Sequence, residues 1–509
     1  MNAHAAIFPI LIPLAAALLQ LVVRHLGLPV QRHIGLFAAV LGILSAVWLV
    51  QLADSGNMLV YALGDWAAPV GIVLVADRLA AGMTLLTALL AGASLLYASG
   101  GFDKRGRHFH PLFQLQIMGI QGAFLTGDLF NLFVFFEVML LASYTLLAHG
   151  GGLARSRASL TYVVLNLAGS ALFLIALGLL YGTLGTLNLA DVALRLQTAE
   201  HNIALARLAG ALLIAVFALK AALLPLSFWL PHTYAAAGAP VAALFVIMTK
   251  VGIVAILRVQ AIAFAPSPTM ADLLTGWLTP LALMTVLFAA LGALVATRLR
   301  YFAAWLVLVS AGTLLIAPAH AQADITAAAL YYLVQSTFIG AAFFLLTELI
   351  SEQRGEVADA IQPGPSFQAP WLALGFFTAA ITAAGLPPFS GFIGKLMLLA
   401  SLWETAAGTA IWIVLLIASF LIIVALSRVG SRLFWQHKAA IAPLVPHSPP
   451  WQSVLAVLLL IAAGPLLAIF ARPVADYAAR AATQLHAPGA YVNGVLGTSG
   501  LVIVREARP

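Results

Sequence analysis

Long apolar segments separated by short polar loops run through the whole chain. A helix that crosses about 30 Å of hydrocarbon needs roughly 20 apolar residues. About fourteen segments reach this length, starting near residues 4, 33, 76, 111, 129, 159, 203, 239, 270, 301, 325, 370, 407 and 451. The first has no basic leader and no cleavage pattern before Arg24, so we expect a span there. The pattern predicts an all-α polytopic membrane protein with about fourteen transmembrane helices.

Charge alternates between successive loops. The basic loops carry Arg24 and Arg32; Lys104, Arg105 and Arg107; Arg155 and Arg157; Arg298 and Arg300; Arg354; and Arg428, Arg432 and Lys438. By the positive-inside rule these loops are cytoplasmic, and an even number of spans then places both termini in the periplasm. The loop at 232–237 is the exception, because it should be cytoplasmic but has no Lys or Arg.

Two segments outside the spans have patterns of their own. Residues 59–65 and 70–74 are rich in β-branched and aromatic side chains and flank turn formers at 66–69, which predicts an external β-hairpin. The tail predicts a short helix around 475–485 and has no catalytic pattern.

Composition supports a membrane location. Apolar residues make up 63% of the chain, charged residues make up 8%, and the mean hydropathy is +1.05. The absence of cysteine excludes disulfides, thiolate-bound clusters and Cys-type zinc sites. The net charge of +7 is scattered over short loops, so it indicates topology and not nucleic-acid binding.

Two spans contain matching proline breaks. The seventh contains Leu224-Pro225 and the twelfth contains Leu386-Pro387-Pro388, each followed closely by Ser and Phe. Proline removes a backbone donor, and membrane helices tolerate the loss only against protein or water. Matching breaks indicate a transporter built from repeats, although proline is also common in membrane helices.

The breaks lie five spans apart, so the repeats have an odd number of helices and are inverted. This predicts four parts: helices 1–3 with the hairpin at 1–110, two inverted five-helix repeats at 111–265 and 266–436, and helix 14 with an external tail at 437–509.

Ionisable residues lie inside several apolar segments, namely Asp77, Glu137, Lys220, Lys250, Glu348 and Lys395. A charge at the bilayer centre costs at least ~2.5–3.5 kcal/mol. A chain that keeps several charges of both signs is expected to pair them around a water-filled interior. Such residues favour an ion or proton pathway.

Four of these residues are predicted near mid-membrane. Glu137 lies well inside the fifth span and Lys250 well inside the eighth, each about 14 Å along a helix, while Lys220 and Lys395 lie beside the two breaks. Opposite charges favour each other's charged form. Glu137 and Lys220 could therefore open and close as a proton switch; a static ion pair that fixes helix packing is the alternative.

Asp77 and His232 each allow two interpretations. Asp77 precedes Arg78 near the start of a span, so an interfacial ion pair is as plausible as a pathway role. His232 follows the first break and could relay protons between Lys220 and Lys250, or hydrogen-bond at a helix end.

Glu348 and Glu404 lie at predicted span ends. Glu348 is expected to be an exit residue or a solvated helix end, and Glu404 an outer mouth for Lys395. The pair His108 and His110 has no carboxylate neighbours and does not indicate a metal site. The sequence contains no nucleotide, flavin or cluster motif, so no cofactor is expected.

Three motifs resemble the antiporter-like chains of Mrp-type cation/proton antiporters and of the complex I membrane arm. The motifs are residues 130–144 around Glu137; Lys220 with Leu224-Pro225-Leu226, Trp229-Leu230-Pro231-His232, Pro240 and Thr249-Lys250-Val251-Gly252; and residues 385–395 ending at Lys395. Within this family, Gly64-Asp65-Trp66, Asp77-Arg78 and the lysine at 395 are most similar to the Mrp (Pha) antiporter branch. Many relatives have a His and a Lys in span eleven, whereas residues 332–340 here contain neither.

The resemblance implies a subunit of a bacterial inner-membrane antiporter that exchanges Na⁺, K⁺ or Li⁺ for protons. Its implied partners are the other Mrp-type subunits (A/B, C, E, F and G) and membrane lipid, with no nucleic acid and no enzyme activity. The alternative is a proton-pumping subunit of a redox enzyme, such as complex I or a membrane-bound hydrogenase.

Overall fold

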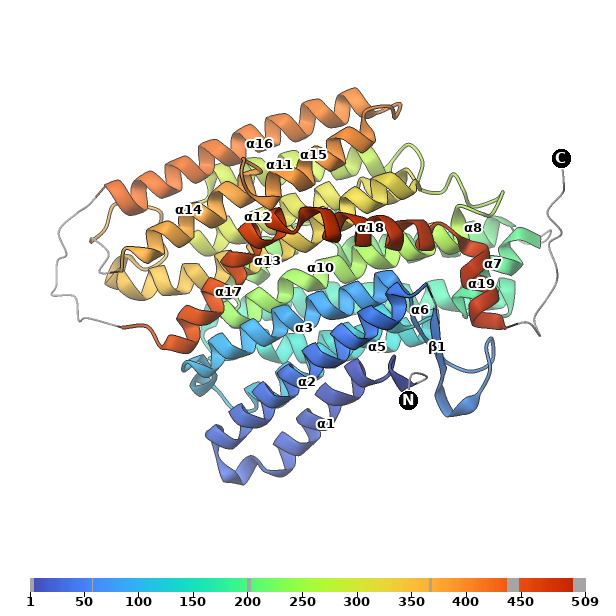
Figure 1. Ribbon diagram of the computed structural model, residues 1–509, viewed down its shortest axis with the longest axis horizontal. Helices are drawn as coiled ribbons and strands as arrows, with labels where there is room; N and C mark the ends of the chain where they lie inside the picture. Colours follow the sequence, from blue (N-terminus) through green and yellow to red (C-terminus); the bar gives the residue numbers. More distant parts are fainter. Residues whose placement is uncertain (1–3, 57, 199–202, 366–368, 437–447, 498–509) are drawn as a thin grey trace.

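The computed structural model describes residues 4–56, 58–198, 203–365, 369–436 and 448–497, which form a bundle of long, roughly parallel helices (Figure 1). Within these residues, eleven helices are long and apolar enough to cross a membrane. They are α2 (Leu28–Asp54), α3 (Arg78–Ser99), α5 (Leu129–Leu147), α6 (Leu153–Leu184), α8 (Ile203–Lys220), α10 (Ala239–Val259), α11 (Leu278–Val295), α12 (Leu299–Leu314), α13 (Ala323–Gln353), α16 (Gly408–Gly430) and α17 (Trp451–Ile469). The prediction of an all-helical polytopic fold is confirmed.

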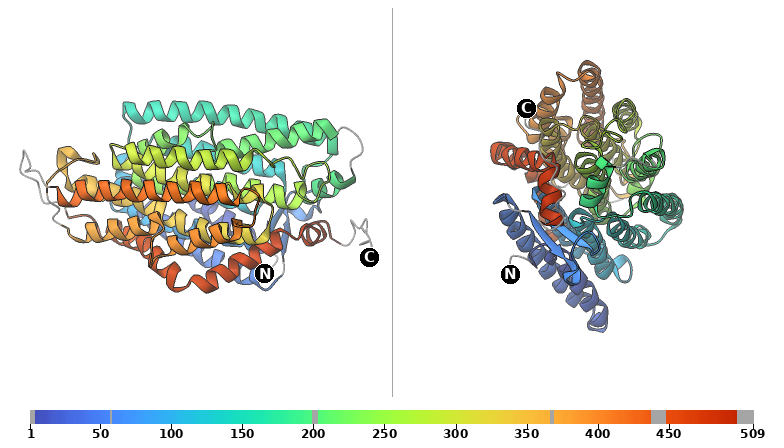
Figure 2. Two further views of the ribbon diagram at one scale, coloured as in Figure 1. Left: turned by 90° about the horizontal axis from the view of Figure 1, so that it is seen from above. Right: turned by 90° about the vertical axis from the view of Figure 1, so that its right-hand side faces the viewer.

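Shorter helices complete the bundle. They are α1 (Phe8–Val22), α4 (Phe109–Leu125), α7 (Leu189–Thr198), α9 (Trp229–Ala236), α14 (Trp371–Ala384), α15 (Ser390–Leu402), α18 (Ala471–Leu485) and α19 (Pro488–Leu496). Fourteen spans would require α1 and α4 to cross the membrane and the pairs α8/α9 and α14/α15 to cross once each. The exact count and the inverted repeats therefore stay predictions. The second view of Figure 2 shows the helices nearly end-on.

The predicted ninth span begins later than expected. The apolar pattern placed its start near residue 270, whereas α11 begins at Leu278. Pro266 and Pro268 interrupt the chain here, and residues 265–277 form turns. Gly276 adopts a left-handed φ of 85° directly before the helix, so the apolar composition of this stretch does not extend the helix back to residue 270.

Both predicted breaks interrupt the helices. At the first, α8 ends at Lys220 and α9 starts at Trp229. At the second, α14 ends at Ala384, and Gly385 terminates it with a left-handed φ of 78°. Glycine is favoured in this conformation because it has no Cβ. The breaks leave helix-terminal backbone groups inside the bundle, where side chains can bind them.

The hairpin and the tail helix form as the sequence indicates. Strands β1 (Leu59–Ala62) and β2 (Val73–Ala76) pair antiparallel, with Leu59 opposite Ala76. The predicted tail helix is α18, which starts at Ala471 and packs against α13 and α3. Its buried face consists of small residues and leucine, so the helix can lie close along the bundle.

The basic loops gather at one end of the bundle. Arg32 pairs with Asp103 at 2.6 Å, and Arg105 pairs with Glu348 at 3.1 Å, so loops distant in sequence meet here. Burial alone would raise the pKa of Asp103, but hydrogen bonds from Arg32 and His110 hold that pKa below its usual value. Loops of the same predicted sidedness are therefore neighbours, while the compartment that they face stays a prediction.

Cysteine labelling tests that sidedness, and the chain offers a background free of native cysteine. Arg107→Cys and Arg157→Cys should react with an impermeant maleimide only from the cytoplasmic side, because positive loops are retained there. Asp65→Cys and Glu404→Cys are the matched external positions, and all four side chains are exposed. Labelling of both arginine positions from outside intact cells would contradict the topology.

Candidate functional site

Glu137 and Lys220 both contact the same face of α6. Glu137 lies on α5, and its Oε1 accepts a hydrogen bond from Ser170 Oγ. Lys220 Nζ donates to Asn166 Oδ1 at 2.9 Å. Asn166 and Ser170 are one turn apart on α6, so they project from the same side of that helix. Among the described ion pairs, none joins Glu137 to Lys220 directly; two polar side chains of α6 hold the two charges instead.

Close packing of α8 against α10 brings Lys250 into the same region. A Cβ on Gly252 would lie 2.9 Å from the backbone of Ala221 and 3.1 Å from Lys220 Cβ, so only glycine permits this approach. Lys250 precedes Gly252 by two residues on α10. Trp229 Nε1 donates to Leu219 O at 3.2 Å and thereby holds the end of α8 beside the break.

Lys250 is fully buried, with 0% of its surface exposed. Its Nζ donates to Ser310 Oγ on α12 at 3.0 Å, and Ser310 in turn donates to Val307 O at 2.9 Å. Among the described residues, no carboxylate pairs with Lys250. A buried ammonium without a counter-charge carries a large desolvation cost, so a purely structural role does not account for this lysine.

Lys395 binds the second helix break. Its Nζ donates to Ala384 O, at the end of α14, at 2.7 Å and to Ser419 Oγ on α16 at 3.1 Å. A cation is favoured at a helix C-terminus, where carbonyl groups lack intrahelical partners. A Cβ on Gly385 would lie 2.5 Å from Lys395 Cδ, so this glycine makes room for the lysine as well as ending the helix.

Helix α13 lies between Lys250 and Lys395, because it packs against both α10 and α15. Tyr332 and Gln335 of α13 are buried, and Gln335 Oε1 has no hydrogen-bond partner. A Cβ on Gly394 would lie 3.3 Å from Tyr332 Cα, so α15 approaches α13 closely beside Lys395. This part of α13 therefore supplies a hydroxyl and an amide. We call Glu137, Lys220, Lys250 and Lys395 the charged row.

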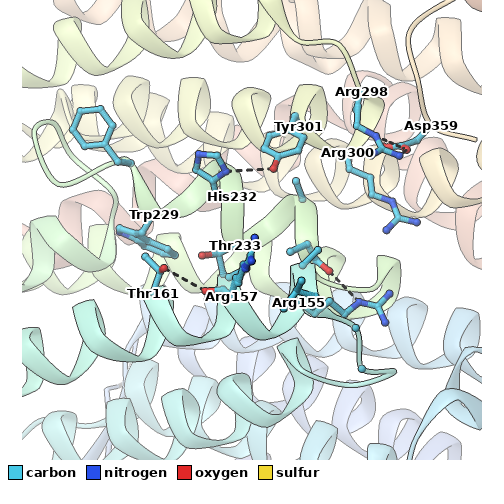
Figure 3. Close-up of a pocket in the computed structure, with 18 of the residues that line it drawn as sticks. Arg155, Arg157, Thr161, Trp229, His232, Thr233, Arg298, Arg300, Tyr301 and Asp359 are labelled. Atoms are coloured by element: carbon cyan, nitrogen blue, oxygen red, sulfur yellow. Dashed lines mark hydrogen bonds and ion pairs between the residues drawn. The ribbon is translucent and has the colours of Figure 1, made fainter.

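A cavity of about 810 Å³ opens at the end of the bundle that carries the basic loops. Figure 3 shows His232 and Tyr301 beside it, with His232 Nδ1 3.3 Å from the Tyr301 hydroxyl oxygen. His232 is exposed, and among its described contacts it meets neither lysine, so the structure places it at the cavity and not between Lys220 and Lys250. Trp229 lines the cavity and contacts α8 next to Lys220.

Asp77 does not form the interfacial ion pair that was one of its two predicted roles. It caps α3 by accepting from Ala80 N at 2.7 Å, and it pairs with Arg258 of α10 at 2.9 Å. Arg78 instead pairs with Asp54 at 3.2 Å. The predicted Asp77–Arg78 pair is wrong because a helix N-cap points its side chain back over the first turn, away from the residue that follows.

The two glutamates at predicted span ends differ in burial. Glu348 is 5% exposed and accepts from Arg105 and Arg300, so the prediction of a solvated helix end is wrong. Arg105 comes from the segment before α4 and Arg300 from the first turn of α12, and the span pattern does not place either beside Glu348. Glu404 is exposed in the turn between α15 and α16, outside the charged row. Among the described residues, no group of three or more His, Asp or Glu could hold a metal ion.

The polar partners of the charged row were not found from the sequence. Asn166 and Ser170 lie in α6, Ser310 lies in α12 and Ser419 lies in α16, all within apolar helices. The four-residue spacing of Asn166 and Ser170 is a signal that could have found two of them, because it puts both on one helix face. Isolated serines are common in membrane helices, so Ser310 and Ser419 carry no such signal.

The fold and the buried charges together define a polytopic membrane protein of the ion-transport class. The family described as NADH:quinone oxidoreductase/Mrp antiporter matches residues 126–423, more than half of the chain. The chain belongs to this family.

Two relatives match this chain over nearly its full length. The chain is 40% identical to the D subunit of a probable K(+)/H(+) antiporter of Rhizobium meliloti, over 97% of both chains. It is 35% identical to the D subunit of the Na(+)/H(+) antiporter of Bacillus subtilis, over 96% of this chain and 99% of that one.

Two solved structures have the same fold. A chain of the Mrp complex from Dietzia sp. DQ12-45-1b superposes with a TM-score of 0.85 at 26% identity, over 97% of this chain and 99% of that chain. A chain of the membrane-bound sulfane sulfur reductase, an archaeal respiratory membrane complex, gives 0.88 at 25% identity, over 97% and 100%.

Proposed function

We propose that this chain is the proton-translocating subunit of a multisubunit antiporter that exchanges a monovalent cation for protons, with the charged row as its proton path. The observation that carries the proposal is the row itself. It places four ionisable side chains inside the bundle, with hydroxyl, amide and backbone carbonyl groups as their described partners. The antiporter is a secondary transporter and not an enzyme.

Glu137 and Lys220 act as a switch at one end of the row. In the separated arrangement, Asn166 holds the ammonium and Ser170 donates to the carboxylate. The carboxylate retains a proton more readily while the ammonium is away and releases it when the ammonium approaches, because opposite charges favour each other's charged form. Asn166 therefore stabilises the proton-accepting arrangement of Glu137.

Lys220 then gives its own proton to the neutral amine of Lys250, and the proton released by Glu137 replaces it on Lys220. From Lys250 the proton moves on towards Lys395. Ser310, Tyr332 and Gln335 lie along this second part of the path, and the unpartnered Gln335 Oε1 can accept from a water molecule. Hydroxyl groups both donate and accept hydrogen bonds, so they can carry a proton relay without the usual His and Lys. His232 serves at the cavity end, and Asp77, Glu348 and Glu404 are less direct participants.

The proposal extends to the cation, the partner subunits and the orientation in the membrane. The cation is Na⁺ or K⁺, since relatives of both names match over nearly the full length, with Li⁺ as a further candidate. The partners are the other Mrp-type subunits, A/B, C, E, F and G, together with membrane lipid. The assembly lies in the bacterial cytoplasmic membrane with both termini of this chain in the periplasm, as the loop charges predict.

Transport by the complete complex tests the proposal. Everted vesicles that contain the full subunit set should lose an imposed pH gradient when Na⁺ or K⁺ is added. A proton-pumping subunit of a redox complex is the second candidate, because the fold matches the sulfane sulfur reductase chain equally well. Such a subunit would give no cation-dependent loss of the gradient, and neighbouring genes would encode redox subunits in place of small Mrp-type subunits.

Lys395→Ala tests the second half of the row. The variant should still assemble, because Lys395 binds a carbonyl and a hydroxyl and leaves no carboxylate unpaired when it is removed. Cation-dependent proton flux in vesicles should fall clearly below the wild-type rate. Ser419→Ala is the matched control, since it removes one contact of Lys395 but keeps the lysine. Loss of the assembled complex on a native gel would indicate a structural role instead.

A further inference from the structure

We propose that the cavity beside α6, α9 and α12 binds the phosphate group of an anionic phospholipid. This cavity, called the arginine cavity here, is lined by Arg155, Arg157, Arg298 and Arg300 among other residues. The cavity adjoins the proposed proton path at His232, and a lipid site there does not depend on which cation is exchanged.

The arginine cavity has uncompensated positive charge. Arg298 pairs with Asp359 at 2.7 Å, and Arg300 pairs with Glu348. Arg155 donates only to backbone carbonyls, at 2.9 Å to His149 O and 3.2 Å to Ala236 O. In the described part of the chain, neither Arg155 nor Arg157 has a carboxylate partner. An anion is therefore the complementary ligand, and arginine matches phosphate oxygens with two parallel donors.

The arginine cavity also has an apolar part of its lining. Leu165 and Phe228 line it and are 36% and 60% exposed. The adjoining outer face of α6 exposes Leu160 at 67% and Val164 at 57%, as expected for a surface that faces lipid chains. Figure 3 shows Trp229 and Thr161 towards one side of the cavity and Arg155, Arg298 and Arg300 towards the other.

This gradient from arginine to apolar side chains matches an amphiphile better than a free ion. A phospholipid can place its phosphate among the guanidinium groups and an acyl chain along Leu165 and Phe228. Basic pockets between membrane helices on the cytoplasmic side recognise acidic headgroups in this way. Inorganic phosphate would satisfy the arginines and leave the apolar part of the lining open to water.

The bound phosphate would also change the field near the proposed proton path. Arg155 and Arg157, which have no described carboxylate partner, repel protons and metal cations near His232 and Trp229, because like charges raise the local potential. A phosphate group in the cavity offsets this charge. Anionic lipid should therefore support transport, in addition to binding.

Lipid binding to the purified complex tests the proposal without any transport measurement. Delipidated complex is titrated with phosphatidylglycerol or phosphatidylcholine, and retained lipid is quantified by mass spectrometry. Each basic residue contributes about fivefold to association with an anionic headgroup. The double variant Arg155→Gln/Arg157→Gln should therefore bind phosphatidylglycerol about 30-fold more weakly.

The single variant Arg157→Gln keeps the test valid if the double variant fails to assemble. Arg157 is exposed, and no fold contact of its side chain is described, so its replacement should weaken binding about fivefold without affecting assembly. Arg24→Gln/Arg107→Gln is the control, because both residues are exposed basic positions outside the cavity. It should bind like the wild type.

Two results would overturn the proposal. One is equal binding of both lipids by the wild type, with no change in the variants. The other is displacement of phosphatidylglycerol by millimolar inorganic phosphate, which would identify a soluble anion as the ligand. Failure of antiport in vesicles would leave both lipid results unaffected, so the two proposals fail separately.

Discussion

Glu137→Gln is expected to reduce cation-dependent proton flux to the background of vesicles that lack the complex. Glutamine keeps the shape of the side chain and can still accept from Ser170, but it cannot bind and release a proton. The wild-type carboxylate is half-buried on α5 and contacts α6 through that serine. The measurement is dissipation of an imposed pH gradient on cation addition, normalised to the amount of assembled complex.

Three further variants, at Glu137 and at two neighbouring residues, separate proton transfer from packing. Glu137→Asp should retain part of the flux, because an acid remains although it is retracted by about one methylene. Lys220→Ala should abolish flux, since the switching partner is lost, whereas Ser170→Ala should retain it because the carboxyl group survives. Unpairing a buried charge can cost ~3–5 kcal/mol, so protein level is measured first. Wild-type transport by well-assembled Glu137→Gln would leave a static structural role as the better account.

Much of the fold could be predicted because membrane helices are specified locally. Each apolar segment is long enough to span, and the prolines at 225, 387 and 388 mark the breaks directly. The hairpin followed from β-branched residues around a turn. The start of α11 was misplaced because composition near residue 270 is apolar, while Gly276, with a left-handed φ, interrupts the helical backbone before Leu278. Hydropathy measures solubility in lipid and not backbone hydrogen bonding.

The candidate site was predictable in its charges and not in their partners. A lysine inside an apolar segment is identifiable because its insertion cost requires an explanation. The partner that it meets depends on helix packing, which a single sequence does not contain. The bond from Lys395 to Ala384 O at the helix break is an example, as is the bond from Lys220 to Asn166 of α6.

The same limitation explains the corrections at Asp77 and Glu348. Sequence proximity suggested Arg78 as the partner of Asp77, but the pairing residue is Arg258, on another helix. Glu348 was placed near a helix end, where solvent is the usual neighbour, yet two arginines from distant segments pair with it. Both are buried ion pairs between distant segments, and loop charge alone does not specify such pairs.

Lys250→Met should abolish transport without destabilising the complex. Lys250 has a serine hydroxyl and no described carboxylate as its partner, so methionine removes an uncompensated charge. Replacing buried ionic groups by apolar side chains is often neutral or stabilising by about 1–4 kcal/mol. The midpoint of thermal unfolding of the purified complex should stay constant or rise while cation-dependent proton flux disappears.

Arg258→Met is the matched control for Lys250→Met, because it also replaces a buried cation on α10 by methionine. Arg258 pairs with Asp77 at 2.9 Å, so its loss leaves a buried carboxylate unpaired. This should cost about 3–5 kcal/mol and lower the unfolding midpoint. Opposite effects of the two variants on stability would show that the lysine is kept at this position for transport. Equal destabilisation by both would instead indicate that Lys250 supports helix packing and would remove it from the proposed proton path.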